Sequence, residues 1–256
     1  MSDVEQTQPL ITHLVELRNR LLKAVLTVLV IFLGLFYFAN DLYLILVKPL
    51  SSLLPPGGGM IATGVIAPFM VPFKLTLVLA VLFAVPVILY QIWAFIAPGL
   101  YQHEKKFGIP LLVSSIILFY TGIAFAYFVV LPFAFAFFTA AGPTGISYMP
   151  DISNILDFIL TVFFAFGIAF EIPIATYLMV LTGLTSVKSL TQKRPYIFLG
   201  CFVVGMLVTP PDVFSQTILA VPMWLLFEAG VLAARTIRKP QDESAEAEPS
   251  QEEANP

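Results

Sequence analysis

Charged residues and cysteine are scarce in this chain of 256 residues. Charged residues make up 11% of it and hydrophobic residues 59%, whereas a soluble domain is about half apolar and about a quarter charged. We therefore expect an integral membrane protein. The single cysteine, Cys201, lies in an apolar run, so no disulfide can form within the chain. A small buried side chain is expected there.

Motifs for catalysis, nucleotide binding and metal binding are missing as well. The sequence has no G-x-x-x-x-G-K-[ST] phosphate loop, no G-x-S-x-G elbow and no H-E-x-x-H pair, and it holds only two histidines, His13 and His103. It also has no basic patch with a nucleic-acid-binding motif. We expect no enzyme activity, no cofactor, no metal ion and no nucleic-acid partner.

Long apolar runs predict an all-α membrane domain over residues 21–238, with six transmembrane helices. These spans are expected at about 21–38, 72–95, 109–130, 155–182, 196–208 and 213–234. A full span needs about 20 residues, so the short fifth run predicts local thinning of the bilayer. The segment 39–71 is amphipathic and is interrupted by proline and glycine, which favours short amphipathic helices that cap the far, periplasmic side.

Basic residues predict the orientation of these spans. Eleven of the thirteen Lys and Arg fall on one face of the six-span arrangement, and only Lys48 and Lys74 fall on the other. Because cytoplasmic loops are enriched in Lys and Arg, both termini are expected in the cytoplasm. Asn40-Asp41-Leu42 follows the first run in place of a small-residue cleavage site, so this run is expected to stay as a signal anchor.

The two ends of the chain are polar. Residues 1–20 include a stretch with helical spacing in which Glu16 and Arg20 form an i,i+4 pair, as in an amphipathic helix at the membrane surface. This helix is either a positive anchor for topology or a docking surface. Residues 239–256 are acidic, and we expect them to be a disordered cytoplasmic tail.

A short polar connector, Phe95–Lys106, separates the second and third apolar runs. Its single carboxylate, Glu104, follows two aromatic residues, Phe95 and Tyr101. Such a group can hold a cationic ligand through charge and ring contacts. An ordinary turn at the membrane edge with positive flanks is the alternative interpretation.

Glu171 is an acid in the middle of the fourth apolar run. An ionised acid at mid-bilayer costs roughly 2.5 to 3.5 kcal/mol on insertion scales, so such a residue is a candidate for function. A neutral Glu that bonds to a threonine or backbone group of a neighbouring span is the structural alternative. Two other acids need less explanation: Asp212 lies at a turn and can cap a helix, and Glu228 can pair with Arg235.

Four stretches resemble the signatures of the TatC family, the large subunits of the bacterial twin-arginine protein translocase. The resemblance covers about residues 8–238, and the proteobacterial form is the most similar. The stretches are His13–Arg20, Tyr90–Leu100, Ala165–Pro173, and Lys193–Tyr196 together with Thr209–Asp212.

The resemblance implies a receptor for signal peptides that carry two adjacent arginines. Such a receptor works with the single-span subunits TatA and TatB to export folded proteins across the bacterial inner membrane, using the proton-motive force. Self-association and contact with membrane lipid are also implied. Signal-peptide binding would fall to Glu104, Phe95, Arg18 and Glu16.

The resemblance also implies two further sets of residues. A partner site within the membrane would comprise Glu171, Met206, Thr209 and Phe214, and Pro49, Pro86 and Asp212 would be structurally sensitive. A secondary transporter for a small solute, with Glu171 as its ion site, remains the alternative from the residues alone. It would need a polar cavity at the midplane, whereas a receptor needs residues at the cytoplasmic edge.

Overall fold

The described part of the chain is almost entirely helical. The computed structural model describes residues 3–51, 59–96, 108–140, 149–208 and 213–236, and in these ranges the only strand-like pairing is one bridge between Ile61 and Asp151. Side chains are described within these ranges except at 3–13, 49–51, 96 and 214–215. The predicted all-α class is confirmed.

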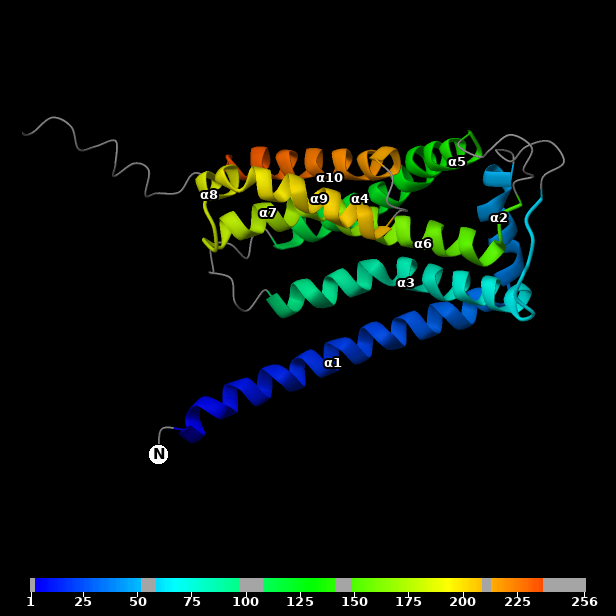
Figure 1. Ribbon diagram of the computed structural model, residues 1–256. Helices are drawn as coiled ribbons and strands as arrows, with labels where there is room; N and C mark the ends of the chain where they lie inside the picture. The colour runs from blue at the N-terminus through cyan, green and yellow to red at the C-terminus, as the bar shows by residue number, and fades with distance from the viewer. Residues whose placement is uncertain (1–2, 52–58, 97–107, 141–148, 209–212, 237–256) are drawn as a thin grey trace, which may run out of the picture.

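Two long helices and one short one form the first third of the fold. They are α1 (Asp3–Phe36), α2 (Ala39–Ser51) and α3 (Ala67–Ile96). The main neighbour of α1 is α3, and α2 lies across one end of the bundle (Figure 1). Pro72 and Pro86 are inside α3, yet the helix continues through both. Both prolines therefore lie within one continuous helix.

The next helical stretch is longer than the predicted third span. It comprises α4 (Gly108–Phe125), a π-helical turn η3 (Ala126–Val130) and α5 (Leu131–Ala140). A π turn carries one more residue per turn than an α-helix, so it shifts the faces on its two sides relative to each other.

The second half of the chain contains the predicted fourth, fifth and sixth spans. Its helices are α6 (Ile152–Ala169), α7 (Ile172–Leu181), α8 (Val187–Gln192), α9 (Arg194–Val208) and α10 (Val213–Ala234). The fourth span is thus two helices that meet at Phe170 and Glu171. Pro173 lies two residues after Glu171, and proline lacks the amide hydrogen that a continuous helix would need.

Close contacts at glycine hold the helices together. A methyl group added at Gly122 of α4 would lie 2.6 Å from the backbone oxygen of Phe166 in α6, and one added at Gly230 of α10 would lie 2.7 Å from Cα of Pro173 in α7. Lipid tails are as apolar as a protein core, so helices in a membrane depend on such close backbone packing. The glycines therefore fix how α4 meets α6 and how α10 meets α7.

Five helical stretches in the described ranges are long and apolar enough to cross a membrane. They are Leu14–Phe36, Ala67–Phe95, Gly108–Ala140, Ile152–Leu181 and Gln216–Ala234. The remaining apolar helix, α9, has 15 residues and is about 22 Å long, against about 30 Å for the hydrocarbon core. The start of α1 and the end of α10 lie at the same end of the bundle, opposite α2 (Figure 1).

Candidate functional site

The N-terminal half of α1 meets the C-terminal end of α3 through polar side chains. Arg20 donates to Oε1 of Glu16 from Nε at 3.0 Å and from Nη2 at 2.5 Å, and this confirms the predicted i,i+4 pair. The same guanidinium reaches Oε1 of Gln91 on α3 at 3.5 Å. Because Gln91 lies one turn before Phe95, this contact places Glu16 beside the start of the connector.

A hollow of about 430 Å³ lies along this part of α1. It is lined by Val15, Glu16, Asn19, Arg20 and Lys23. The hollow is open, and its acid and cations lie on one helix face.

The predicted binding residues differ in their exposure and in the helix on which they lie. Phe95 is half-buried near the end of α3. Arg18 is exposed, and two residues along a helix turn by about 200°, so it lies on a different face of α1 from Glu16. The expectation that both shape one cytoplasmic patch stays a prediction. Glu104 lies outside the described residues.

Arg20 and Gln91 are the site residues that the sequence prediction omitted. The i,i+4 spacing identified the partner of Arg20, and Gln91 stood out as a polar residue in an apolar run. Neither signal showed that the two side chains meet, because residues 20 and 91 come together only through the packing of α1 on α3.

The second candidate region surrounds Glu171 at the junction of α6 and α7. Oε1 of Glu171 is buried without a hydrogen-bond partner among the described residues, and the Ser115 hydroxyl of α4 is the side-chain hydrogen-bond partner of its carboxylate. A buried polar group with an unused acceptor is rare and calls for a functional or structural reason. The alternative of a neutral Glu that bonds to a threonine or backbone group of a neighbouring span stays a prediction.

An exposed face of α9 carries another part of the predicted partner site. Met206 is 48% exposed, and Val203 and Leu207 are exposed beside it. On the opposite side, Gly205 packs against Gln216 of α10, whose side-chain amide donates to the Phe202 carbonyl at 2.7 Å. Cys201 is buried, as expected.

The other predicted residues are less fully described. Thr209 and Asp212 lie outside the described residues. Phe214 is in α10 and Pro49 is in α2, but their side chains are not described.

One predicted ion pair is wrong. Oε2 of Glu228 accepts from Nη2 of Arg194 at 2.6 Å, in place of the expected Arg235. The pair connects the start of α9 with the end of α10, so it fixes one end of this helix hairpin.

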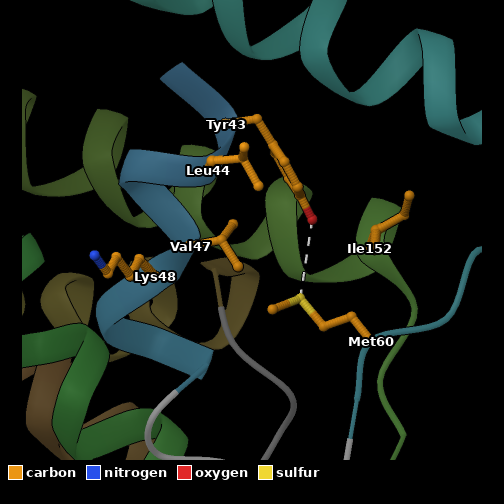
Figure 2. Close-up of a pocket in the computed structure, with 6 residues that line it drawn as sticks. All are labelled: Tyr43, Leu44, Val47, Lys48, Met60 and Ile152. Atoms are coloured by element: carbon orange, nitrogen blue, oxygen red, sulfur yellow. Dashed lines mark hydrogen bonds between the residues drawn. The ribbon is translucent and has the colours of Figure 1, made fainter. Parts of the chain in front are cut away.

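A second hollow, of about 420 Å³, lies at the α2 end of the bundle and is lined by Tyr43, Leu44, Val47, Lys48, Met60 and Ile152. The Tyr43 hydroxyl points at Sδ of Met60, 3.9 Å away (Figure 2). Burial, and secondly the negative charge of Asp151, raise the pKa of the Tyr43 hydroxyl. This hollow has apolar walls and lies at the opposite end of the bundle from the start of α1, so it does not belong to the α1–α3 site (Figure 1).

Asp151 connects the start of α6 to the segment after α2. Its carboxylate caps α6 by accepting from the Ser153 amide, and it accepts from the Thr63 hydroxyl at 2.6 Å and the Thr63 amide at 2.8 Å. These bonds, with that of the Thr63 hydroxyl the largest cause, hold the pKa of Asp151 well below its usual range.

Together the fold and these sites define a multi-span helical membrane protein. It has a charged surface at one end and a polar break in a long apolar stretch, and the described residues contain no cluster of metal ligands.

Comparison with known proteins identifies the particular family. The family model described as "Sec-independent protein translocase protein (TatC)" matches residues 12–222. The chain belongs to the TatC family. It is therefore a multi-span membrane component of the Tat protein translocase, a transport protein and not an enzyme, and it works in a complex with other Tat subunits.

Individual relatives agree over nearly the whole chain. The TatC protein of Azotobacter chroococcum is 57% identical over 97% of this chain and 98% of its own length. That of Escherichia coli K12 is 56% identical over 91% of this chain and 90% of its own. A crystal structure of the twin-arginine translocase receptor TatC matches 88% of this chain and 98% of its own, with 37% identity and a TM-score of 0.78.

Proposed function

We propose that this chain is the signal-peptide receptor of the Tat translocase. It binds twin-arginine signal peptides at its cytoplasmic face and, with TatA and TatB, exports folded proteins across the inner membrane at the expense of the proton-motive force. The protein in the matched crystal structure is a twin-arginine translocase receptor, which supports this role. The observation that carries the proposal is the contact of Arg20 with both Glu16 and Gln91.

Arginine recognition fits the chemistry of this site. A guanidinium forms two parallel hydrogen bonds with a carboxylate, which an ammonium cannot do. Oε2 of Glu16 has no partner among the side chains that the structure describes. We assign the paired arginines to Glu16 and Glu104, with Phe95 as an aromatic neighbour and Arg18 as a second contact of the cytoplasmic surface.

The proposed orientation has six spans, with both termini in the cytoplasm and α9 as the short fifth crossing. Two observations support it. Most described Lys and Arg side chains belong to α1, α8, the start of α9 and the end of α10, which share one end of the bundle (Figure 1). The start of α1 and the end of α10 also share that end, as an even number of crossings requires. In this orientation α2 covers the periplasmic side.

The partner site is proposed on the exposed face of α9, with Met206, Thr209 and Phe214. Glu171 is proposed to accept a polar group of a partner helix or to hold water that thins the bilayer. The 15-residue length of α9 supports thinning there. Membership of a translocase family argues against the alternative of a small-solute transporter.

Site-specific photocrosslinking tests the receptor proposal. A photoreactive residue replaces Phe95 in inverted membrane vesicles, which are offered a twin-arginine precursor or the same precursor with two lysines. We expect crosslinks to the first precursor only. A probe at Tyr37, an exposed aromatic residue just beyond the far end of α1, is the matched control and should give none. Equal crosslinking of both precursors at Phe95 would reject the proposal.

A further inference from the structure

An ion pair joins α3 and α6 on the outer surface of the bundle. Nζ of Lys74 lies 2.5 Å from Oδ1 of Asp157, and the two side chains are 53% and 54% exposed. The other ion pair between helices in the described residues, Arg194–Glu228, is less exposed, at 37% and 19%. The charged groups of Lys74 and Asp157 are therefore accessible from outside the protein.

Helix geometry gives the depth of this pair in the bilayer. α3 has 30 residues and is about 45 Å long, so when centred it extends about 7 Å beyond each side of a hydrocarbon core of about 30 Å. Lys74 is seven residues from the start of α3, or about 10 Å along it. Asp157 is five residues from the start of α6, or about 7 Å along it. Both helices begin at the α2 end (Figure 1), so the pair lies at the boundary between headgroups and hydrocarbon.

The pair has bonding capacity left after its own contact. A lysine ammonium has three donors and an ionised carboxylate has two acceptor oxygens, and only Nζ–Oδ1 is used between them. Thr161, one turn deeper on α6, donates its hydroxyl to the Asp157 carbonyl, so it does not compete for the carboxylate. A ligand with one anionic acceptor and one cationic donor would satisfy both groups.

We propose that Lys74 and Asp157 bind the headgroup of a zwitterionic phospholipid with a primary ammonium, as in phosphatidylethanolamine. The lipid phosphate accepts from Nζ of Lys74, and the lipid ammonium donates to Oδ2 of Asp157. Exposed Leu77, one turn deeper on α3, lies under the acyl chain, and exposed Asn154, one turn outward on α6, lies at headgroup level. Phosphatidylcholine has no N–H to donate, and phosphatidylglycerol has no cation.

Lipid binding to the purified full-length chain tests the proposal. Delipidated protein in mild detergent is titrated with dioleoyl phosphatidylethanolamine, phosphatidylcholine or phosphatidylglycerol, and bound lipid is counted by native mass spectrometry. We expect the first lipid to bind about fivefold more tightly than the other two, since charge-assisted bonds are lost with each of those. Lys74→Gln/Asp157→Asn should abolish this preference without leaving an unpaired charge.

Two variants separate recognition from general loss of structure. Lys74→Arg/Asp157→Glu keeps both charges and should keep the preference. Arg194→Gln/Glu228→Gln removes the other interhelical pair and should leave the preference unchanged. The proposal is overturned if the neutral Lys74/Asp157 variant keeps the preference, if the wild type binds the three lipids equally, or if phosphatidylglycerol binds best.

Discussion

Arg20 binds one oxygen of Glu16 with two nitrogens, Nε at 3.0 Å and Nη2 at 2.5 Å, and its third nitrogen faces Gln91 of the neighbouring helix. Arg20 thus holds the carboxylate of Glu16 in place through Oε1 and leaves Oε2 unbound among the described side chains. An arginine positions the acid, so the acid can accept a second arginine from a ligand. This arrangement leads to the first prediction.

Arg20→Gln should weaken the binding of a twin-arginine peptide by about threefold to tenfold, because it removes the two charge-assisted hydrogen bonds that orient Glu16. Fluorescence anisotropy of a labelled peptide with purified protein measures this. Lys23→Gln removes a charge from the same hollow and leaves the bonds of Arg20 to Glu16 and Gln91 in place, so it should have the smaller effect. Equal losses in the two variants would show that only net charge matters.

Glu171→Leu should slow transport severalfold, because it removes both the hydrogen bond with Ser115 and the unpartnered oxygen at the α6–α7 junction. Glu171→Gln keeps one hydrogen-bonding oxygen and should transport at close to the normal rate. Transport of a precursor into inverted vesicles, normalised to the amount of TatC-family protein in the membrane, measures both variants. Normal transport by Glu171→Leu would remove Glu171 from the mechanism.

Gly230→Ala should lower the free energy of unfolding by about 1 to 3 kcal/mol, because the added methyl would lie 2.7 Å from Cα of Pro173 and the backbone must move. Gly200→Ala on α9 is the matched control, because nothing lies within 4 Å of a methyl added there. Thermal unfolding in detergent compares the two variants. A Gly230→Ala protein as stable as Gly200→Ala would contradict the packing of α10 on α7.

Thr63→Val should destabilise the protein in a pH-dependent way. The Thr63 hydroxyl is the largest cause of the low pKa of Asp151, whose ordinary value is 3.8. A carboxylate whose pKa is lower in the folded state stabilises the fold above its unfolded pKa, and this contribution is lost as the pH falls through the folded pKa. The stability difference between wild type and variant should therefore be constant above pH 3.8 and shrink below it.

The control for this pH dependence is Thr217→Val, which removes a hydroxyl that donates to a carbonyl of its own helix. Its stability difference should not vary over the same pH range. Unfolding in denaturant, followed at several pH values, provides the comparison. If Thr63→Val and Thr217→Val show the same pH profile, the bond to Asp151 does not set the acid sensitivity.

The membrane class and most helix positions were predictable because apolar periodicity and span length act locally. The predicted span 72–95 falls inside α3, and 213–234 coincides with α10. The helix break at Glu171 was not predicted. Its sequence signal is Pro173, two residues after Glu171, because proline has no amide hydrogen to continue the hydrogen bonding of the helix.

Ion pairs between helices that are distant in the sequence could not be predicted from the sequence. Glu228 has Arg235 within two turns along the chain, yet it binds Arg194, because the α9–α10 hairpin brings that guanidinium closer. Lys74 of α3 binds Asp157 of α6, which is 83 residues away along the chain. Such partners depend on helix packing, which hydropathy does not encode.

The exposure of α1 has a consequence for the order in which the protein is made. No residue from Leu14 to Phe36 is buried, and the main neighbour of α1 is α3, which the ribosome completes about sixty residues later. The newly made α1 must therefore be stable in lipid by itself until α3 has been synthesised. Assembly can then begin from an anchored first helix onto which each later hairpin is added.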